Sequence, residues 1–137
     1  MAVLNATTPI GHELPPISRR FSVDMFAAGG ARTIHNDVAA ARAEGLSGPI
    51  AVAPDVASLI FRMMRLCFDE GWIVGGKSSI TFRRPVGVDD FCVANGTVVA
   101  KEPEHGGKLR ITCDVWIETE HGVKAIVGTC SGLVDAA

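Results

Sequence analysis

Residues 54–68, with the sequence PDVASLIFRMMRLCF, decide the fold of this chain. Their apolar side chains recur at intervals of three and four residues, the spacing of one long α-helix. The residues with that spacing are Val56, Leu59, Ile60, Met63, Met64 and Cys67. Pro54 suits the first turn of the helix, and we expect Gly71 to end it. Because Phe61 and Leu66 widen the apolar stripe beyond one face, the helix is expected to be wrapped by other structure.

After this helix the sequence has the two-residue period of β-strands. The clearest case is 110–118, where apolar and polar residues alternate. The predicted strands are 78–82, 91–100, 110–118 and 123–134. Turns rich in glycine and charged residues separate them, so neighbouring strands should pair antiparallel with one face to bury.

The part before the helix is less regular. Residues 1–13 are polar and interrupted by Pro and Gly, which favours a flexible N-terminal arm. We expect an edge strand at 14–21 and short helices at 22–28 and 36–44, with Asn36 as the N-cap of the second. The whole order predicts an α+β fold in which a curved antiparallel sheet wraps around one long central helix. A different α+β sandwich is the alternative.

Composition narrows the function classes. A chain of 137 residues suits one domain, here 14–137, and its 47% hydrophobic and 20% charged residues are those of a globular protein. The net charge of -2 gives no reason to expect nucleic acid or a membrane as partner. The pairs Arg19–Arg20 and Arg83–Arg84 are interpreted as solvated strand ends, with phosphate contacts as the alternative.

The cysteines and the N-terminus indicate a compartment and exclude several cofactors. The four cysteines form no C-x-x-C pair, so we expect no metal site, and their apolar surroundings suit a reducing compartment. The N-terminus lacks the basic and apolar regions of a signal peptide, so a cytoplasmic location is expected. No dinucleotide or Walker motif is present, and we expect no cofactor.

One segment carries candidate chemistry. His35 lies in a loop just before the helix that Asp37 begins, and the chain then returns through Gly48–Pro49 to the long helix. If the two features meet, an imidazole faces the backbone N–H groups of a helix end, which is a general base beside an oxyanion site. The alternative is that His35 only packs or caps.

The same segment resembles a known family. The stretch IHNDVAAARAEGLSGPIA (34–51) is similar to the hydratase motif of MaoC-like proteins, in which an IH-x-D helix start precedes a PIAHG loop. The stretches GGKSSITF (75–82), FRRPVGVDDFCVANGTV (82–98) and VGTCSGLV (127–134) also resemble that family. The resemblance covers about residues 14–134.

The resemblance implies a hotdog fold and (R)-specific enoyl-CoA hydratase chemistry. In such a lyase, water is added to an enoyl thioester or removed from a 3-hydroxyacyl thioester, with coenzyme A or acyl carrier protein as the substrate handle. His35 matches the family histidine, and the backbone of Ala51, Val52 and Ala53 is expected to hold the carbonyl. The family also implies at least a homodimer, or a pair with a different subunit.

Two departures from the family pattern leave the mechanism open. Gly30 stands where the family has a catalytic aspartate, and Ala51–Val52–Ala53 replaces its AHG triplet. Asp37 or Asp55 is a candidate second catalytic group, although each is also explained as a charge at a helix N-terminus. The alternatives are an isomerase, retro-aldol, conjugate-addition or thioesterase reaction, or a non-catalytic acyl-binding subunit. Arg32 is a further candidate for substrate binding, or else a solvated loop residue.

Overall fold

The computed structural model describes residues 2–26 and 30–137. The strands are β1 (Ile17–Arg20), β2 (Lys77–Phe82), β3 (Phe91–Glu104), β4 (Lys108–Thr119) and β5 (Lys124–Asp135). The helices are α1 (Val38–Ala43), α2 (Ala53–Phe68) and α3 (Glu70–Gly75), with short 3-10 turns η1 (Val23–Phe26) and η2 (His105–Gly107). The helix expected at 22–28 is seen as η1, and residues 27 and 28 lie outside the described residues.

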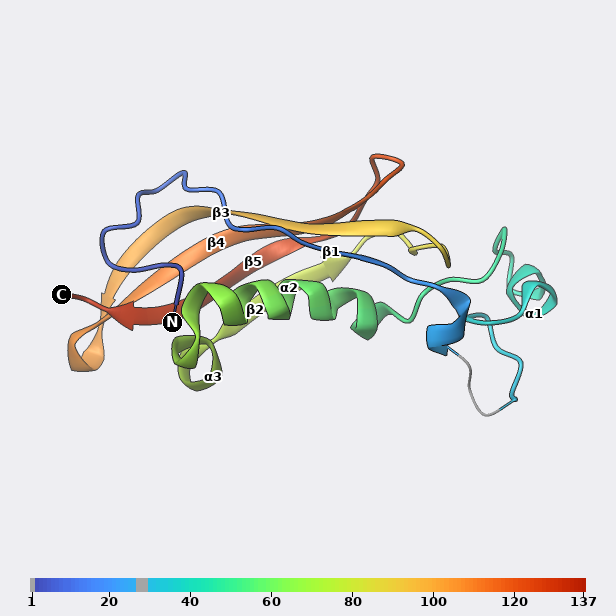
Figure 1. The fold of residues 1–137 in the computed structure, drawn as a ribbon, viewed down its shortest axis with the longest axis horizontal. Coiled ribbons are helices and arrows are strands. Elements are labelled where there is room, and N and C mark those ends of the chain that lie inside the picture. Colours follow the sequence, from blue (N-terminus) through green and yellow to red (C-terminus); the bar gives the residue numbers. More distant parts are fainter. Residues whose placement is uncertain (1, 27–29) are drawn as a thin grey trace.

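The strands form one antiparallel sheet in the order β1-β3-β4-β5-β2. The sheet is curved, and α2 lies along its inner face (Figure 1). This is the predicted hotdog arrangement, and the predicted α+β fold class is confirmed. Among the described residues, no helix is long and apolar enough to cross a bilayer.

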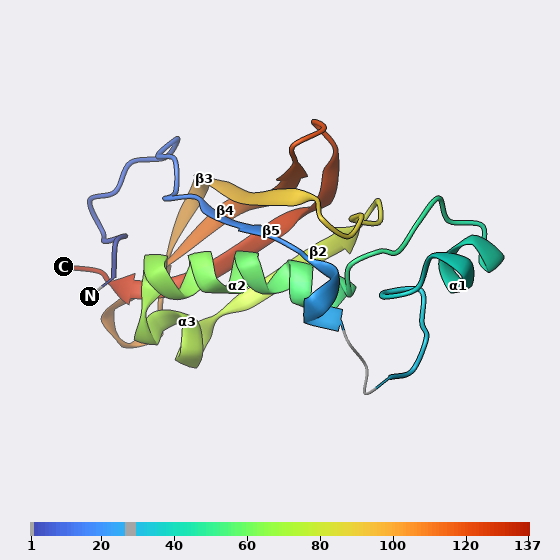
Figure 2. The ribbon, with the colours of Figure 1, turned by 45° about the vertical axis from the view of Figure 1, so that its right-hand side comes forward.

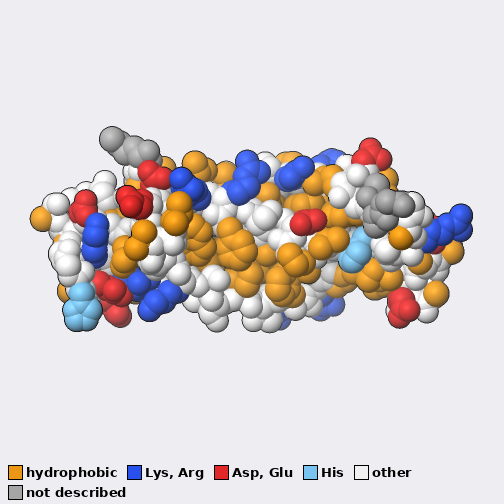
Figure 3. All heavy atoms as spheres, turned by 90° about the horizontal axis from the view of Figure 1, so that it is seen from below, with side chains coloured by type: hydrophobic (Ala, Val, Ile, Leu, Met, Phe, Trp, Pro, Cys, Tyr) orange, Lys and Arg blue, Asp and Glu red, His pale blue; other side chains and the backbone are white. Residues whose placement is uncertain are grey.

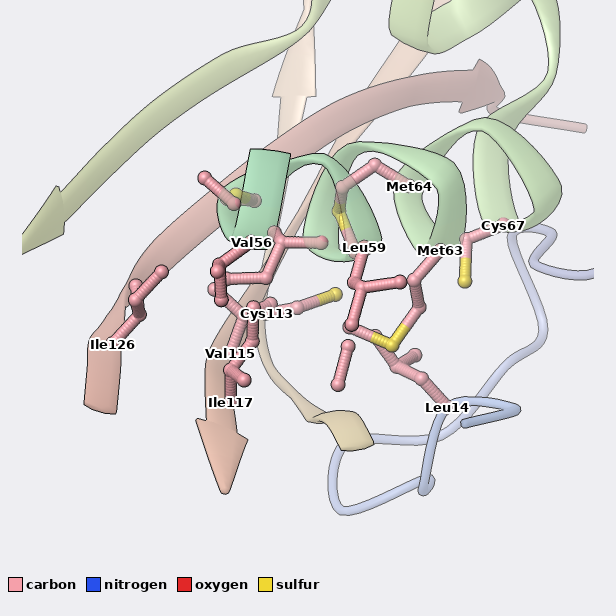
Figure 4. Close-up of a cluster of buried hydrophobic side chains, with 14 of the residues drawn as sticks. Leu14, Val56, Leu59, Met63, Met64, Cys67, Cys113, Val115, Ile117 and Ile126 are labelled. Atoms are coloured by element: carbon pink, nitrogen blue, oxygen red, sulfur yellow. The ribbon is translucent and has the colours of Figure 1, made fainter. Parts of the chain in front are cut away.

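The core lies between α2 and the sheet. Every second residue of β4 is buried, as its alternation predicts: Ile111, Cys113, Val115 and Ile117. Figure 4 shows Cys113, Val115 and Ile117 of β4 on the side of the sheet that faces α2, whose Val56, Leu59 and Met63 point toward them, with Ile126 of β5 beside them. The apolar residues of 54–68 therefore hold the helix against the sheet.

The residues that the structure describes cover the side of α2 away from the sheet only in part. Leu66 on that side is 48% exposed, and Phe61 is only partly buried. Figure 3 shows the hydrophobic side chains gathered on the face seen from below, where α2 lies. The sheet therefore covers one side of α2, and the expected wrapping by other structure is seen on that side among the described residues.

The end of α2 also differs from the sequence-based expectation. The helix ends at Phe68, and the chain turns at Asp69, whose φ of 50° is in the left-handed region. The short helix α3 follows and contains Gly71, the residue expected to terminate α2. The turn lets α3 pack on β5, and these contacts rather than the local sequence explain α3.

The N-terminal segment is held against the domain rather than loose. Val3 and Leu4 donate backbone hydrogen bonds to the carbonyls of Leu66 and Cys67, at 3.1 and 3.0 Å. The side chain of Leu4 is only 2% exposed. Residues 2–13 thus satisfy carbonyl groups that a helix end leaves unpaired, which their polar composition did not reveal.

Candidate active site

The loop that carries His35 lies beyond the N-terminal end of α2. Figures 1 and 2 both place α1 and its flanking loops there, away from the sheet. Two backbone contacts fix this position: the N–H of Ile50 donates to the carbonyl of Ile34 at 3.0 Å, and that of Ala51 to the carbonyl of Val86 at 2.7 Å. The segments before α1 and before α2 are therefore side by side.

The ring of His35 is oriented by the segment that leads into α2. Its Nδ1 lies 2.8 Å from the carbonyl oxygen of Ile50. A carbonyl oxygen only accepts, so Nδ1 donates and carries the proton in the neutral ring. The lone pair is then on Nε2, the form that a general base requires.

The start of α2, which follows Ile50 in the chain, offers backbone donors. The N–H groups of Val52 and Ala53 donate no hydrogen bond to any residue that the structure describes. The Ala51 N–H is taken by Val86, so its predicted role as a donor to substrate is not available in this conformation. Two amides at the positive end of the helix dipole remain for an oxyanion.

The candidate carboxylates are placed differently. Asp37 is the N-cap of α1, where its side chain accepts from the N–H of Ala40 at 2.8 Å, so the predicted Asn36 cap is wrong. Asp55 is exposed in the first turn of α2, and Arg32 is exposed in the loop. Gly30 has a φ of +88°, and a Cβ there would meet nothing within 4 Å. The structure thus brings His35 to the helix end but engages Asp37 as a cap.

Comparisons with known proteins agree with this architecture. No family model and no curated protein sequence matches this chain. Among solved structures, the (R)-hydratase of A. caviae involved in PHA biosynthesis is similar, with 25% identity, a TM-score of 0.71 and coverage of 94% of this chain and 98% of that one. The chain has a MaoC-like hotdog fold.

Two further solved structures have a similar fold. The MaoC-like dehydratase of Rhodospirillum rubrum has a TM-score of 0.74 at 18% identity, with 93% of each chain covered. The HadBC 3R-hydroxyacyl-ACP dehydratase complex of Mycobacterium tuberculosis has a TM-score of 0.65 at 15% identity, covering 93% of this chain and 98% of that one. The family resemblance found in the sequence is therefore confirmed at the level of the fold.

A pocket of about 250 Å³ adjoins the start of α2 in this MaoC-like fold. Its walls are apolar apart from two arginines, and the lining residues are Ile50, Ala51, Ala53, Val56, Phe82, Arg83, Arg84, Pro85, Val86 and Ile126. From the sequence this pair was interpreted as a solvated strand end, with phosphate contacts as the alternative. The F-x-x-P-V pattern that resembles MaoC-like proteins leaves the two arginine positions unspecified, so it did not mark them.

The cysteines of this MaoC-like chain are not suited to nucleophilic catalysis. Burial raises the pKa of the Cys67 and Cys92 thiols to about 11, and that of Cys113 and Cys130 to about 12. The reactive form of a cysteine is the thiolate, which is scarce at neutral pH under these conditions. His35 is therefore the better candidate for the reacting group.

One group of side chains has metal-ligand chemistry within the described part of the chain. Donor atoms of Asp90, Glu120 and His121 lie within 4.8 Å of one another. The carboxylates are already engaged, because Glu120 accepts from the N–H of Phe91 and Asp90 from that of Gly87. These contacts explain the group as part of the turns that join the strands.

Proposed function

We propose that this chain is a hydratase or dehydratase that adds water to an enoyl thioester, or removes it from a 3-hydroxyacyl thioester. The observation that carries the proposal is the orientation of His35. Its Nδ1 is held by the carbonyl of Ile50, in the segment that leads to the unpaired amides of Val52 and Ala53, and the lone pair of the neutral ring is then on Nε2. The solved structures of similar fold that are described as (R)-hydratases and dehydratases support the same reaction class.

The reaction follows from these groups. Nε2 of His35 takes a proton from water while the water oxygen forms a bond to C3 of the enoyl thioester. The π electrons of the C2–C3 bond move toward the thioester carbonyl, whose oxygen becomes negative. The Val52 and Ala53 amides stabilise that charge in the transition state more than the neutral carbonyl, which is the requirement for catalysis.

A single histidine completes the proton balance in the absence of an aspartate. After taking the proton from water, His35 is an imidazolium, and it returns that proton to C2. The product is a 3-hydroxyacyl thioester, and the histidine is neutral again. This sequence needs no carboxylate at Gly30, although Asp55 in the first turn of α2 is a candidate for holding the water. Asp37 is the weaker candidate because it caps α1.

The test is hydration of crotonyl-CoA by the purified chain and by His35→Asn. Removal of a general base typically costs about 10²–10⁴-fold in rate, so we expect kcat/KM to fall by that amount. The matched control is His105→Asn, which changes an exposed histidine in η2. It should keep the rate of the unchanged protein.

Other outcomes identify the alternatives. Release of free thiol from the substrate would indicate a thioesterase, since a hydratase leaves the thioester intact. Binding of the acyl thioester without any turnover by the unchanged protein would rule out the hydratase. An equal loss of rate in both histidine variants would show that His35 has no special role.

The second candidate is a non-catalytic acyl-binding subunit. The specific observation in its favour is Gly30, which leaves the position of the family aspartate without a side chain. Because the HadBC dehydratase is described as a complex, a different subunit is the natural partner under this hypothesis. It predicts that hydration activity requires that partner, even at high concentrations of this chain.

We also propose that the protein assembles as a homodimer in a reducing compartment such as the cytoplasm. The exposed side of α2, with Leu66, supports an assembly that covers it. The four cysteines are free and buried, which suits a reducing environment. The substrate handle under this proposal is coenzyme A or acyl carrier protein.

A further inference from the structure

Arg83 and Arg84 lie together at the pocket beside the start of α2. They follow the last residue of β2, where consecutive side chains would normally point to opposite faces of the sheet. Here the N–H groups of both residues donate to the same carbonyl, that of Ala125, at 2.8 and 3.2 Å. The regular pairing of the strands is therefore broken after β2, and Pro85 follows directly. Both arginines can then line the same pocket.

Their guanidinium groups are available to a ligand. Both residues are exposed, and neither side chain makes a hydrogen bond or ion pair with any residue in the described ranges 2–26 and 30–137. None of the residues lining the pocket is a carboxylate. The pocket therefore carries two positive charges on a chain whose net charge is -2.

The rest of the pocket is apolar and narrow. Its volume of about 250 Å³ is just below the usual range of roughly 300–1,000 Å³ for small-molecule sites, so it suits a thin chain rather than a bulky group. Ala53 and Ile50 form part of its wall, and Ile50 also accepts the hydrogen bond from His35. The pocket is thus lined both by residues of the proposed reaction site and by the two arginines.

We infer that Arg83 and Arg84 form a phosphate subsite for the phosphopantetheine handle of the substrate. This inference rests on the proposed function, because it assigns the part of the thioester that lies away from the reacting carbons. The thin pantetheine arm occupies the apolar pocket, while its phosphate stays at the exposed arginines. The planar guanidinium groups of the two arginines can each donate several N–H hydrogen bonds. The oxygens of a phosphate accept such charge-assisted bonds.

The test is direct binding, measured by calorimetry without any turnover. The probes are pantetheine, 4′-phosphopantetheine, coenzyme A and octanoate. We expect both phosphate-bearing probes to bind at least about tenfold more tightly than pantetheine, with a preference that weakens as salt increases. In Arg83→Gln/Arg84→Gln this preference should disappear.

The matched control is Arg19→Gln, which removes an exposed arginine from β1, at the other edge of the sheet. It should retain the phosphate preference, and the melting temperature of each variant checks that the chain folds. Tighter binding of coenzyme A than of 4′-phosphopantetheine would assign the free coenzyme as the source. Equal binding would assign a carrier protein, since both probes then use the same single phosphate.

Several results would overturn the subsite. They are equal binding of pantetheine and coenzyme A, an equal loss in the Arg19 control, or octanoate binding as tightly as the phosphate probes. The proposed function fails separately, through absence of hydration by a protein that still binds coenzyme A. Conversely, unchanged KM for crotonyl-CoA in the double variant would reject the subsite and leave the hydratase standing.

Discussion

At the scale of a single residue, Asn36 fixes the loop that carries His35. Its Oδ1 accepts from the N–H of Thr33 at 2.9 Å, and its Nδ2 donates to the carbonyls of Phe26 and Ala31 at 3.0 and 2.9 Å. These bonds fix the chain on both sides of Gly30. The position of the imidazole therefore depends on a neighbouring amide that does not touch the reacting atoms.

We predict that Asn36→Ala loosens this loop without unfolding the domain. It removes three hydrogen bonds, each worth about 0.5–1.5 kcal/mol, from a segment on the edge of the fold. Amide hydrogen exchange at residues 30–36 should become at least about tenfold faster, while exchange in β4 stays unchanged.

The control for that measurement is Asn95→Ala, whose side chain donates one hydrogen bond to the carbonyl of Val93. It should leave exchange in the loop as it was. If Asn36→Ala also leaves the loop unchanged, the side chain has no positioning role.

The residues of the site were partly predictable from the sequence. The approach of His35 to the start of α2 followed from the short connection through Gly48–Pro49. The use of the Ala51 amide by Val86 did not, because that bond joins segments far apart in the chain. The N-cap was assigned to Asn36 instead of Asp37, since either residue type caps a helix and only the tertiary bonds of Asn36 exclude it.

At the scale of elements, the contact of α3 with β5 depends on the absence of a side chain. A Cβ at Gly71 would lie 1.8 Å from the carbonyl oxygen of Leu133. Two non-bonded heavy atoms cannot approach that closely, so α3 or β5 must shift when a methyl group is added. Gly71 therefore sets the spacing between the two elements.

We predict that Gly71→Ala destabilises the protein. Helix propensity alone would make alanine about 1 kcal/mol more favourable than glycine, whereas overpacking typically costs about 1–3 kcal/mol. The clash is with backbone that cannot move aside alone, so the second effect should dominate. The measurement is the free energy of unfolding in urea.

Gly48→Ala is the matched control, because a Cβ at Gly48 would meet nothing within 4 Å and the residue has no positive φ. Its effect should be small. Stabilisation by Gly71→Ala would show that α3 and β5 separate at no cost.

Elements with a clear period were predicted well, and short ones were not. The strands 110–118 and 123–134 agree closely with β4 (Lys108–Thr119) and β5 (Lys124–Asp135) because alternation extends through them. The sequence EGWIVG shows neither the three-to-four-residue spacing of a helix nor the two-residue alternation of a strand. Its helix α3 is explained by packing on β5.

At the scale of the whole molecule, an apolar surface and an unpaired strand lie next to each other. β2 is the last strand of the sheet order, so its outer side pairs with no other strand in the described part of the chain. On α3, Ile73 and Val74 are 63% and 74% exposed. Monomers protect such edges and patches, and their exposure here supports the proposed dimer.

We predict that the protein has twice the 14.4 kDa mass of one chain in light scattering at micromolar concentration. Ile73→Glu/Val74→Glu should reduce the mass to that of one chain, because charges would be buried without partners. Ile10→Glu changes an equally exposed isoleucine of the N-terminal segment and should leave the dimer intact. A monomeric unchanged protein would contradict the proposal.

The overall architecture was the most predictable feature. One helix with a wide apolar stripe followed by alternating strands has few ways to bury both, and the predicted sheet around a helix is the one observed. The wide apolar stripe also favoured an assembly of at least two chains, although the stripe alone does not identify the molecule that covers the second side of α2.

The order of elements along the chain has a consequence for synthesis. β1 and α2 precede β3, β4 and β5, the strands against which they are buried in the finished molecule. During translation the apolar side chains of α2 therefore leave the ribosome before their covering surface has been made. Until the last strand emerges, the apolar side chains of the nascent helix must be shielded from water by the ribosome surface or by chaperones.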